Sequence, residues 1–306
     1  MTATLSRTGS RHTAPGLLVA GGAGCLSASA MFVKLAGADV ATTAFLRCAL
    51  ALVALVPLAL SELRRQGPMP APLLWASAAA GVFLGADYLM WAASIAAVGA
   101  GMATVLINVA VVVFPVLARL FSGVPIARRF RLAAPLMLIG VALAGGMLSG
   151  PAASGSPVAG TLLGIAAGAA YAGFLQLNRL SGQQSPQHLS TPVCVATVAA
   201  SAAAGLVGEL GVGGTGIHLW MPVMSWVWLA ALALLGQVVA WLLVGAGSAR
   251  LAPGTTGGLL LLQPVLAIGL GVLVLGERPT AVQLLGCAVV IVAVWFATGG
   301  TRRTTG

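Results

Sequence analysis

The sequence predicts an all-α integral membrane protein with ten transmembrane helices, arranged as two inverted five-helix repeats. The prediction rests on the composition, on ten long apolar segments and on an internal repeat. The 306-residue chain is 59% hydrophobic and 7% charged, whereas soluble domains are about half apolar and about a quarter charged. Its mean hydropathy is +1.04. Such a composition favours a lipid bilayer as the main partner of the chain.

Ten apolar segments are long enough to cross a bilayer, which takes about 20 residues of helix. They are too long for barrel strands and lack the alternation of such strands. Arg7, Arg11 and the triplet Ala28-Ser29-Ala30 leave open a cleaved signal peptide, which would reduce the number of spans to nine. The ten predicted spans are residues 15–36, 39–60, 71–97, 100–121, 131–149, 157–180, 192–210, 223–247, 251–275 and 280–298.

The basic residues predict that both ends of the chain face the cytoplasm. Twelve of the fifteen Lys and Arg residues then lie on the cytoplasmic side, and only Lys34, Arg47 and Arg278 lie on the outer side, as the positive-inside rule requires. The net charge of +10 therefore follows from membrane topology, and no nucleic-acid partner is expected. The expected location is a cell membrane, specifically the bacterial cytoplasmic membrane. The predicted parts are a cytoplasmic tail (1–14), a first repeat (15–150), a second repeat (151–298) and a cytoplasmic tail (299–306).

The peptide Pro-Val-Leu-Ala occurs at residues 115–118 and again at 264–267. The first copy falls in the fourth predicted span and the second in the ninth. Because five spans separate the copies, the second half enters the membrane in the opposite direction from the first. A Leu-Gly pair and a Trp precede each copy in the same order. These features indicate an inverted-topology repeat, which gives secondary transporters a binding site near the bilayer midplane.

Three stretches carry a longer pattern: FVKLAGADVATTAFLRCALAL, ADYLMWAASI and GLLLLQPVLAIGLGVLVLGERPTAVQLLG. The last has a Gln-Pro pair followed by a Gly-Glu pair. In this order the stretches resemble the EamA-like transporters of the drug/metabolite transporter superfamily, from about residue 17 to 298. The resemblance implies ten helices in two inverted halves and movement of small metabolites, often amino acids, usually outward. The chain departs from the family pattern where Ala127-Arg128 stands in place of a first Gly-Glu pair.

Two charged residues are predicted to lie within the outer half of the membrane. Asp87 is the only carboxylate deep inside a predicted span, and Arg47 lies about two turns into the second span. These depths allow an Arg47–Asp87 ion pair. Such a pair would either lock the second and third spans together or border a cavity and bind the charged ends of a zwitterion.

Aromatic and amide side chains form a second set at middle or inner depths. Trp91 and Trp241 lie deeper than the interfacial belt where membrane Trp is usual, and they occupy related positions in the two halves. Gln237 and Gln263 lie near mid-span, where an amide bonds either to a neighbouring helix or to a substrate. The predicted substrate-binding residues are Asp87, Tyr88, Trp91, Asn108, Tyr171, Gln237, Trp241 and Gln263.

Proline and glycine predict where helices bend and where they approach closely. Pro115 and Pro264 each remove a backbone hydrogen bond from the preceding turn, so they are predicted hinge residues, with a static kink as the alternative. Gly160, Gly164 and Gly168 recur every four residues in the sixth span, which predicts close approach of another helix.

The sequence gives no indication of an enzyme. The three histidines, His12, His188 and His218, lie in the tail or in loops, and no acid pair, metal motif or nucleophile motif lies at membrane depth. No catalytic residue, cofactor or metal is therefore expected. The predicted function is that of a secondary transporter, in particular an exporter of a small metabolite that works by alternating access around a central cavity. A passive channel for small solutes is the alternative.

Overall fold

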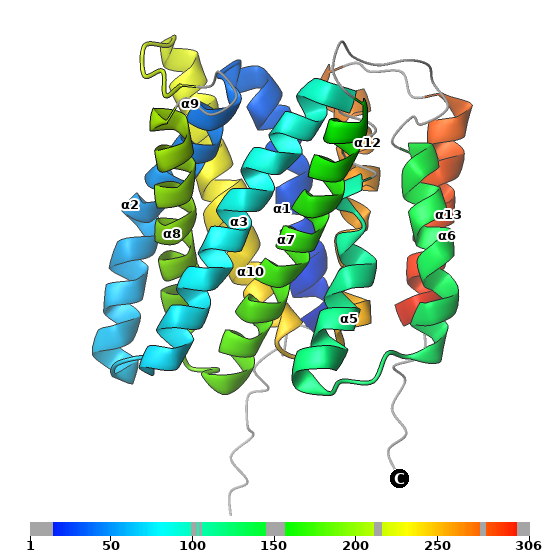
Figure 1. The fold of residues 1–306 in the computed structure, drawn as a ribbon, viewed down its shortest axis with the longest axis horizontal. Helices are drawn as coiled ribbons and strands as arrows, with labels where there is room; N and C mark the ends of the chain where they lie inside the picture. The colour runs from blue at the N-terminus through cyan, green and yellow to red at the C-terminus, as the bar shows by residue number, and fades with distance from the viewer. Residues whose placement is uncertain are drawn as a thin grey trace, which may run out of the picture.

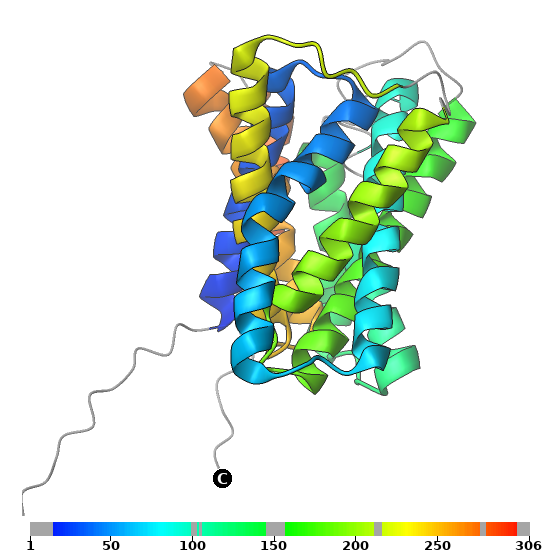
Figure 2. The same ribbon diagram turned by 90° about the vertical axis from the view of Figure 1, so that its left-hand side faces the viewer.

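The computed structural model describes residues 15–98, 103, 106–144, 157–210, 216–275 and 280–298. Within these residues the regular secondary structure is helical, and the helices form an upright bundle (Figures 1 and 2). Helix α1 begins and α13 ends at the lower end of the bundle in Figure 1. The helices are α1 (Pro15–Ala36), α2 (Val40–Gln66), α3 (Ala71–Val98), α5 (Ala110–Ser122), α6 (Arg128–Ala144), α7 (Pro157–Gln184), α8 (Ser190–Glu209), α9 (Val223–Ala231), η2 (Leu232–Val239), α10 (Ala240–Ser248), α11 (Pro253–Leu260), α12 (Leu262–Leu275) and α13 (Ala281–Thr298).

Seven helical stretches in the described part of the chain are long and apolar enough to cross a membrane. They correspond to the first three predicted spans and to the sixth through ninth. Two further apolar helices are shorter, at Ala110–Ser122 and Ala281–Ala297. The chain is thus a multi-pass membrane protein by length and composition of its helices. Parts of the fourth and fifth predicted spans lie outside the described residues, so the count of ten stays a prediction, and so does the orientation.

Helix α2 continues past its predicted end at residue 60 to Gln66. Its first turn is capped by Asp39, whose carboxylate accepts a hydrogen bond from the Thr42 N–H at 3.0 Å. Its last turn carries Arg64 and Arg65, whose positive charges interact favourably with the negative end of the helix dipole. Gly67 then ends the helix with a φ of 81°, a conformation that glycine adopts without strain.

Two of the long helices are irregular at mid-length. Helices α9 and α10 are joined without a break by η2, a π-helical segment of eight residues, and such segments are frequent at functional sites. Helices α11 and α12 are separated at Leu261, three residues before Pro264. Pro264 has no N–H to donate to the carbonyl of Leu260, and its ring crowds that carbonyl, which accounts for the break.

The two halves of the chain pack against each other reciprocally. Helix α3 runs along α7, and α1 runs along the continuous α9–η2–α10 helix. The third membrane helix of the first half (α3) thus packs against the first of the second half (α7). The first of the first half (α1) packs against the third of the second half (α9–η2–α10). Helix α2 packs against α8, and α6 packs against α13 at one side of the bundle in Figure 1. An exchange of this kind is what a two-fold relation between two similar units produces.

Glycines allow the closest helix contacts. A Cβ atom on Gly168 would lie 2.6 Å from the carbonyl oxygen of Ile107, and one on Gly164 would lie 2.7 Å from the Cβ of Leu106. The close approach predicted for this glycine series in α7 is therefore present. Gly81 of α3 has the same role against α8, because a Cβ there would collide with the backbone of Ala196. These contacts bring α7 against the segment just before α5, and α3 against α8.

Candidate functional site

A cavity of about 200 Å³ lies between α1, α3, α7 and the α11–α12 pair, and it is called the central cavity below. Sites for drug-sized ligands typically have volumes of about 300–1,000 Å³, so this volume suits a smaller solute. Its polar and aromatic lining residues are Ser27, Ser29, Arg47, Asp87, Tyr88, Trp91, Asn108, Tyr171, Trp241 and Gln263.

Eleven residues were predicted from the sequence as substrate-binding, ion-pair or hinge residues, and nine of them line this cavity. The two exceptions are Gln237 and Pro115. Gln237 is fully buried behind Tyr88, and Pro115 borders a separate small pocket near Phe130 and Pro253. Pro264 lines the central cavity itself, so the two predicted hinge residues have different surroundings. Ser27 and Ser29 were not singled out, because two serines in a run of Ala, Gly and Ser carry no signal of depth or direction.

Arg47 reaches the cavity from α2 and is held there by two contacts. Its Nη2 donates a hydrogen bond to the carbonyl oxygen of Gly236 in η2, at 2.9 Å. The guanidinium carbon lies 4.2 Å from the centre of the Tyr88 ring, a cation–π contact. The side chain is 8% exposed, and its Nε has no hydrogen-bond partner in the described part of the chain. Arg47 is therefore fixed in position while one of its donors stays unused.

Asp87 is 3% exposed, and its Oδ1 also lacks a hydrogen-bond partner among the described residues. Within the same residues, no hydrogen bond or ion pair joins Asp87 to Arg47. The direct ion pair expected from the sequence is therefore not formed in this structure. The reason lies in the geometry of Arg47, whose guanidinium is held by the Gly236 carbonyl and the Tyr88 ring. Both side chains thus line one cavity, with no hydrogen bond or ion pair joining them in the described part of the chain.

Aromatic rings line the central cavity and pack behind it. The Trp241 ring meets Phe174 edge-on, with ring centres 4.6 Å apart, and meets Tyr171 at 6.1 Å. Phe174 lies one turn after Tyr171 on α7 and is 2% exposed, and Phe114 of α5 is fully buried. These large side chains belong to one buried core cluster, which also includes Trp241. Along α1 the cavity is lined from Leu26 to Val33.

The amide of Gln263 lies beside a second tyrosine. Its Nε2 donates to the Tyr171 hydroxyl at 3.5 Å, and its backbone carbonyl accepts a hydrogen bond from the Ser27 hydroxyl at 3.0 Å. The second bond ties α12 to α1 at the turn where Pro264 interrupts the helix. Polar groups from α1, α7 and α12 therefore meet at one edge of the cavity.

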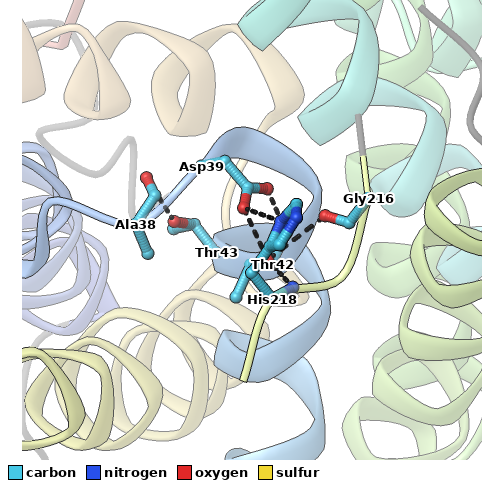
Figure 3. Close-up of polar contacts among 6 residues, drawn as sticks. All are labelled: Ala38, Asp39, Thr42, Thr43, Gly216 and His218. Carbon is cyan, nitrogen blue, oxygen red and sulfur yellow. Dashed lines mark hydrogen bonds and ion pairs between the residues drawn. The ribbon is translucent and has the colours of Figure 1, made fainter. Parts of the chain in front are cut away.

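A separate polar cluster, drawn in Figure 3, lies at the start of α2, which is at the upper end of the bundle in Figure 1. Asp39 Oδ2 is 3.0 Å from His218 Nδ1 and accepts a hydrogen bond from the Thr42 hydroxyl at 2.8 Å. The His218 N–H donates to the same Thr42 hydroxyl at 2.8 Å. Partial burial would raise the pKa of the Asp39 carboxyl, but the hydrogen bonds from Thr42 and His218 lower this pKa below its usual value. The cluster ties the segment before α9 to the start of α2.

At the lower end, Glu62 of α2 holds the start of α8. One carboxylate oxygen accepts hydrogen bonds from the N–H groups of Leu189 and Ser190, at 2.6 and 3.0 Å. The other accepts from the N–H and the hydroxyl of Thr191, at 2.7 and 2.6 Å. A carboxylate at this position satisfies N–H groups that have no partner within the helix and favours the positive end of its dipole. Glu62 therefore has a structural role.

A helical bundle of this apolar composition, with charged groups facing a central cavity, is typical of multi-pass membrane transport proteins. The EamA-like transporter family matches the chain twice, over residues 14–146 and 158–299. The chain belongs to this family, and the two matches confirm the two repeats predicted from the sequence. A crystal structure described only as that of a protein has a similar fold, with a TM-score of 0.75 and 18% identity over 95% of this chain and 99% of that chain. No curated protein matches the chain.

Proposed function

We propose that the protein is a secondary transporter that exports a small metabolite across a cell membrane by alternating access around the central cavity. The observation that carries the proposal is the pair of buried, opposite charges, Arg47 and Asp87, that face one cavity without bonding to each other. Membership in the EamA-like family supports the transporter class. The proposed location is the bacterial cytoplasmic membrane, with ten spans and both termini in the cytoplasm, as the distribution of basic residues predicts.

The charges also support a substrate class. A buried ionised group is costly unless a partner compensates it, and a substrate with both an ammonium group and a carboxylate would compensate both residues at once. Asp87 would accept from the ammonium group, and Arg47 would donate to the carboxylate through the side of the guanidinium that Gly236 leaves free. The rings of Trp91, Tyr171 and Trp241 suit an apolar substituent. A small amino acid with an apolar side chain has these features.

The packing of the helices supports alternating access rather than a continuous pore. Trp241, which lines the cavity, packs edge-on against Phe174, and Phe114 of the same core cluster is fully buried, so packed aromatic side chains back the cavity. The reciprocal packing of the two halves would allow them to exchange roles, so that the cavity opens to opposite sides of the membrane in two related states. Pro115 and Pro264 are the proposed flexible points.

The competing function is that of a passive channel. A screen of metabolites by thermal unfolding of the purified protein would identify a ligand, because a compound that binds the folded state raises its stability. That ligand is then loaded into proteoliposomes. Movement against its own gradient, driven by an ion gradient or by exchange, would support a carrier. Movement that only follows the gradient, at a rate that does not saturate, would favour the channel.

A further inference from the structure

Gln237 has surroundings that differ from those of the cavity-lining residues. Its side chain is 0% exposed, and it lies on η2 behind the Tyr88 ring, outside the cavity lining. Its Oε1 accepts a hydrogen bond from the Tyr88 hydroxyl at 2.8 Å, and its Nε2 donates to the Thr197 hydroxyl of α8 at 3.2 Å. A substrate in the cavity therefore meets Tyr88 before it could meet Gln237, and the substrate contact predicted for Gln237 is not available in this structure.

The hydroxyl of Tyr88 is used within the protein. It donates to Gln237 and accepts a hydrogen bond from the indole N–H of Trp241 at 3.4 Å. What Tyr88 presents to the cavity side is its ring, over which the Arg47 guanidinium lies. The position of the ring is thus set from behind, by Gln237 and Thr197, and the position of the guanidinium depends on the ring.

The π-helical segment anchors both contacts in a single turn. The carbonyl that accepts from Arg47 belongs to Gly236, and the amide that accepts from Tyr88 belongs to the next residue, Gln237. The backbone at Gly236 has little freedom to shift, because a Cβ atom there would collide with the hydroxyl of Ser29 on α1. One turn of η2 therefore fixes the guanidinium directly and the tyrosine ring through its hydroxyl.

We propose that Gln237 and Thr197 are positioning residues of the substrate site, which hold the Tyr88 ring and thereby orient Arg47 toward the cavity. The inference deepens the proposed function and rests on it, since orientation of Arg47 matters for transport only if the cavity holds a substrate. Thr197 carries no charge and lies in a run of Ala and Val, so the sequence alone does not distinguish it from a packing residue.

The chain has only two tyrosines, Tyr88 and Tyr171, which makes a ligand-free test possible. Protein labelled with 3-fluorotyrosine carries a fluorine next to each hydroxyl, and its ¹⁹F NMR spectrum in detergent or nanodiscs should show two environments. The Tyr171→Phe variant assigns the Tyr88 signal. In a second spectrum the Nε–H signal of Arg47, assigned with Arg47→Lys, reports the position of the guanidinium.

Thr197→Val removes the hydroxyl while keeping the shape of the side chain, so it should shift or broaden both the Tyr88 fluorine signal and the Arg47 Nε–H signal. Thr197→Ser, which keeps the hydroxyl, should restore both signals. Ser201→Ala, one turn farther along α8, is the matched control and should leave both signals in place. Gln237→Met should reproduce the effect of Thr197→Val.

The proposal is overturned if the Tyr88 and Arg47 signals are unchanged in a folded Thr197→Val protein, or if only the fluorine signal moves. It is also overturned if Thr197→Ser and Thr197→Val have the same effect, because the effect would then arise from packing. Since no substrate is present, these outcomes do not depend on whether the protein transports anything.

Discussion

The two carboxylates Asp87 and Glu62 should respond in opposite ways to the same chemical change. Asp87 is buried with one oxygen unpartnered among the described residues, whereas Glu62 accepts four hydrogen bonds at the start of α8. Replacing each by its amide keeps the size of the side chain and removes the charge. Asp87→Asn removes a buried charge that gains little from the fold, so the unfolding temperature should stay the same or rise.

Glu62→Gln should lower the stability of the fold. The amide retains one acceptor oxygen, so at least some of the N–H groups at the start of α8 lose their hydrogen-bond acceptor. Hydrogen bonds to charged groups contribute about 1.5–3 kcal/mol each, and partial exposure of Glu62 places the expected loss near the lower figure. For a chain of this size a loss of about 1.5 kcal/mol lowers the unfolding temperature by a few degrees.

The functional effects should be reversed. If Asp87 accepts from an ammonium group, Asp87→Asn removes about 1.5–3 kcal/mol of binding free energy, which corresponds to an affinity about 10- to 100-fold lower. Glu62→Gln should leave the affinity of the folded protein close to that of wild type. The measurements are thermal unfolding of both variants and binding of the ligand found in the metabolite screen. Equal destabilisation by Asp87→Asn and Glu62→Gln, with the ligand affinity of both variants unchanged, would contradict these different roles.

Three further results are expected. Gly81→Ala should lower the free energy of unfolding by about 1–3 kcal/mol or prevent folding, because its Cβ would collide with the Ala196 backbone. Gly24→Ala is the control and should leave stability unchanged, because the added Cβ meets open space. Equal thermal stability of the two variants would contradict this packing. The lowered pKa of Asp39 means that its carboxylate stabilises the fold above its ordinary value of 3.8 and that this contribution is lost as the pH falls through the lower folded pKa. The free energy of unfolding of wild type should therefore exceed that of Asp39→Asn by less than about 1 kcal/mol at neutral pH. This difference should vanish in strong acid, as measured by unfolding at a series of pH values. His218→Ala should give a similar small loss at neutral pH, and a loss of several kcal/mol would show that the upper cluster stabilises more than a partly exposed pair can.

Much of the helical architecture could be predicted from the sequence, because lipid requires long apolar helices and each helix leaves a visible run of residues. The end of α2 is less predictable. Helical hydrogen bonding continues past the apolar part into Glu62, Arg64 and Arg65, whose polarity alone indicates a loop. The π-helical segment η2 could not be predicted, since Leu232–Val239 reads as an ordinary apolar helix. Its packing partners, α1 and α2, are distant in the sequence.

Most of the residues that line the cavity could also be predicted, but the partners of their polar groups could not. Arg47 and Asp87 both line the central cavity, yet the guanidinium bonds to Gly236, a residue 189 positions away. Gln237 lies outside the lining and bonds to Tyr88 and to Thr197 of α8. Position along a span follows from counting residues, whereas the partner of a polar side chain follows from how the helices are rotated against each other.

Solute counterflow in proteoliposomes distinguishes alternating access from passive flow. Vesicles preloaded with the unlabelled ligand from the metabolite screen are diluted into a trace of the same ligand carrying a radioactive label. Wild-type protein should accumulate the label transiently above its equilibrium level, because a carrier exchanges one bound solute for another. Asp87→Asn should lose this overshoot while staying folded. Label that rises only to equilibrium, equally in wild type and in Asp87→Asn, would contradict alternating access around the central cavity.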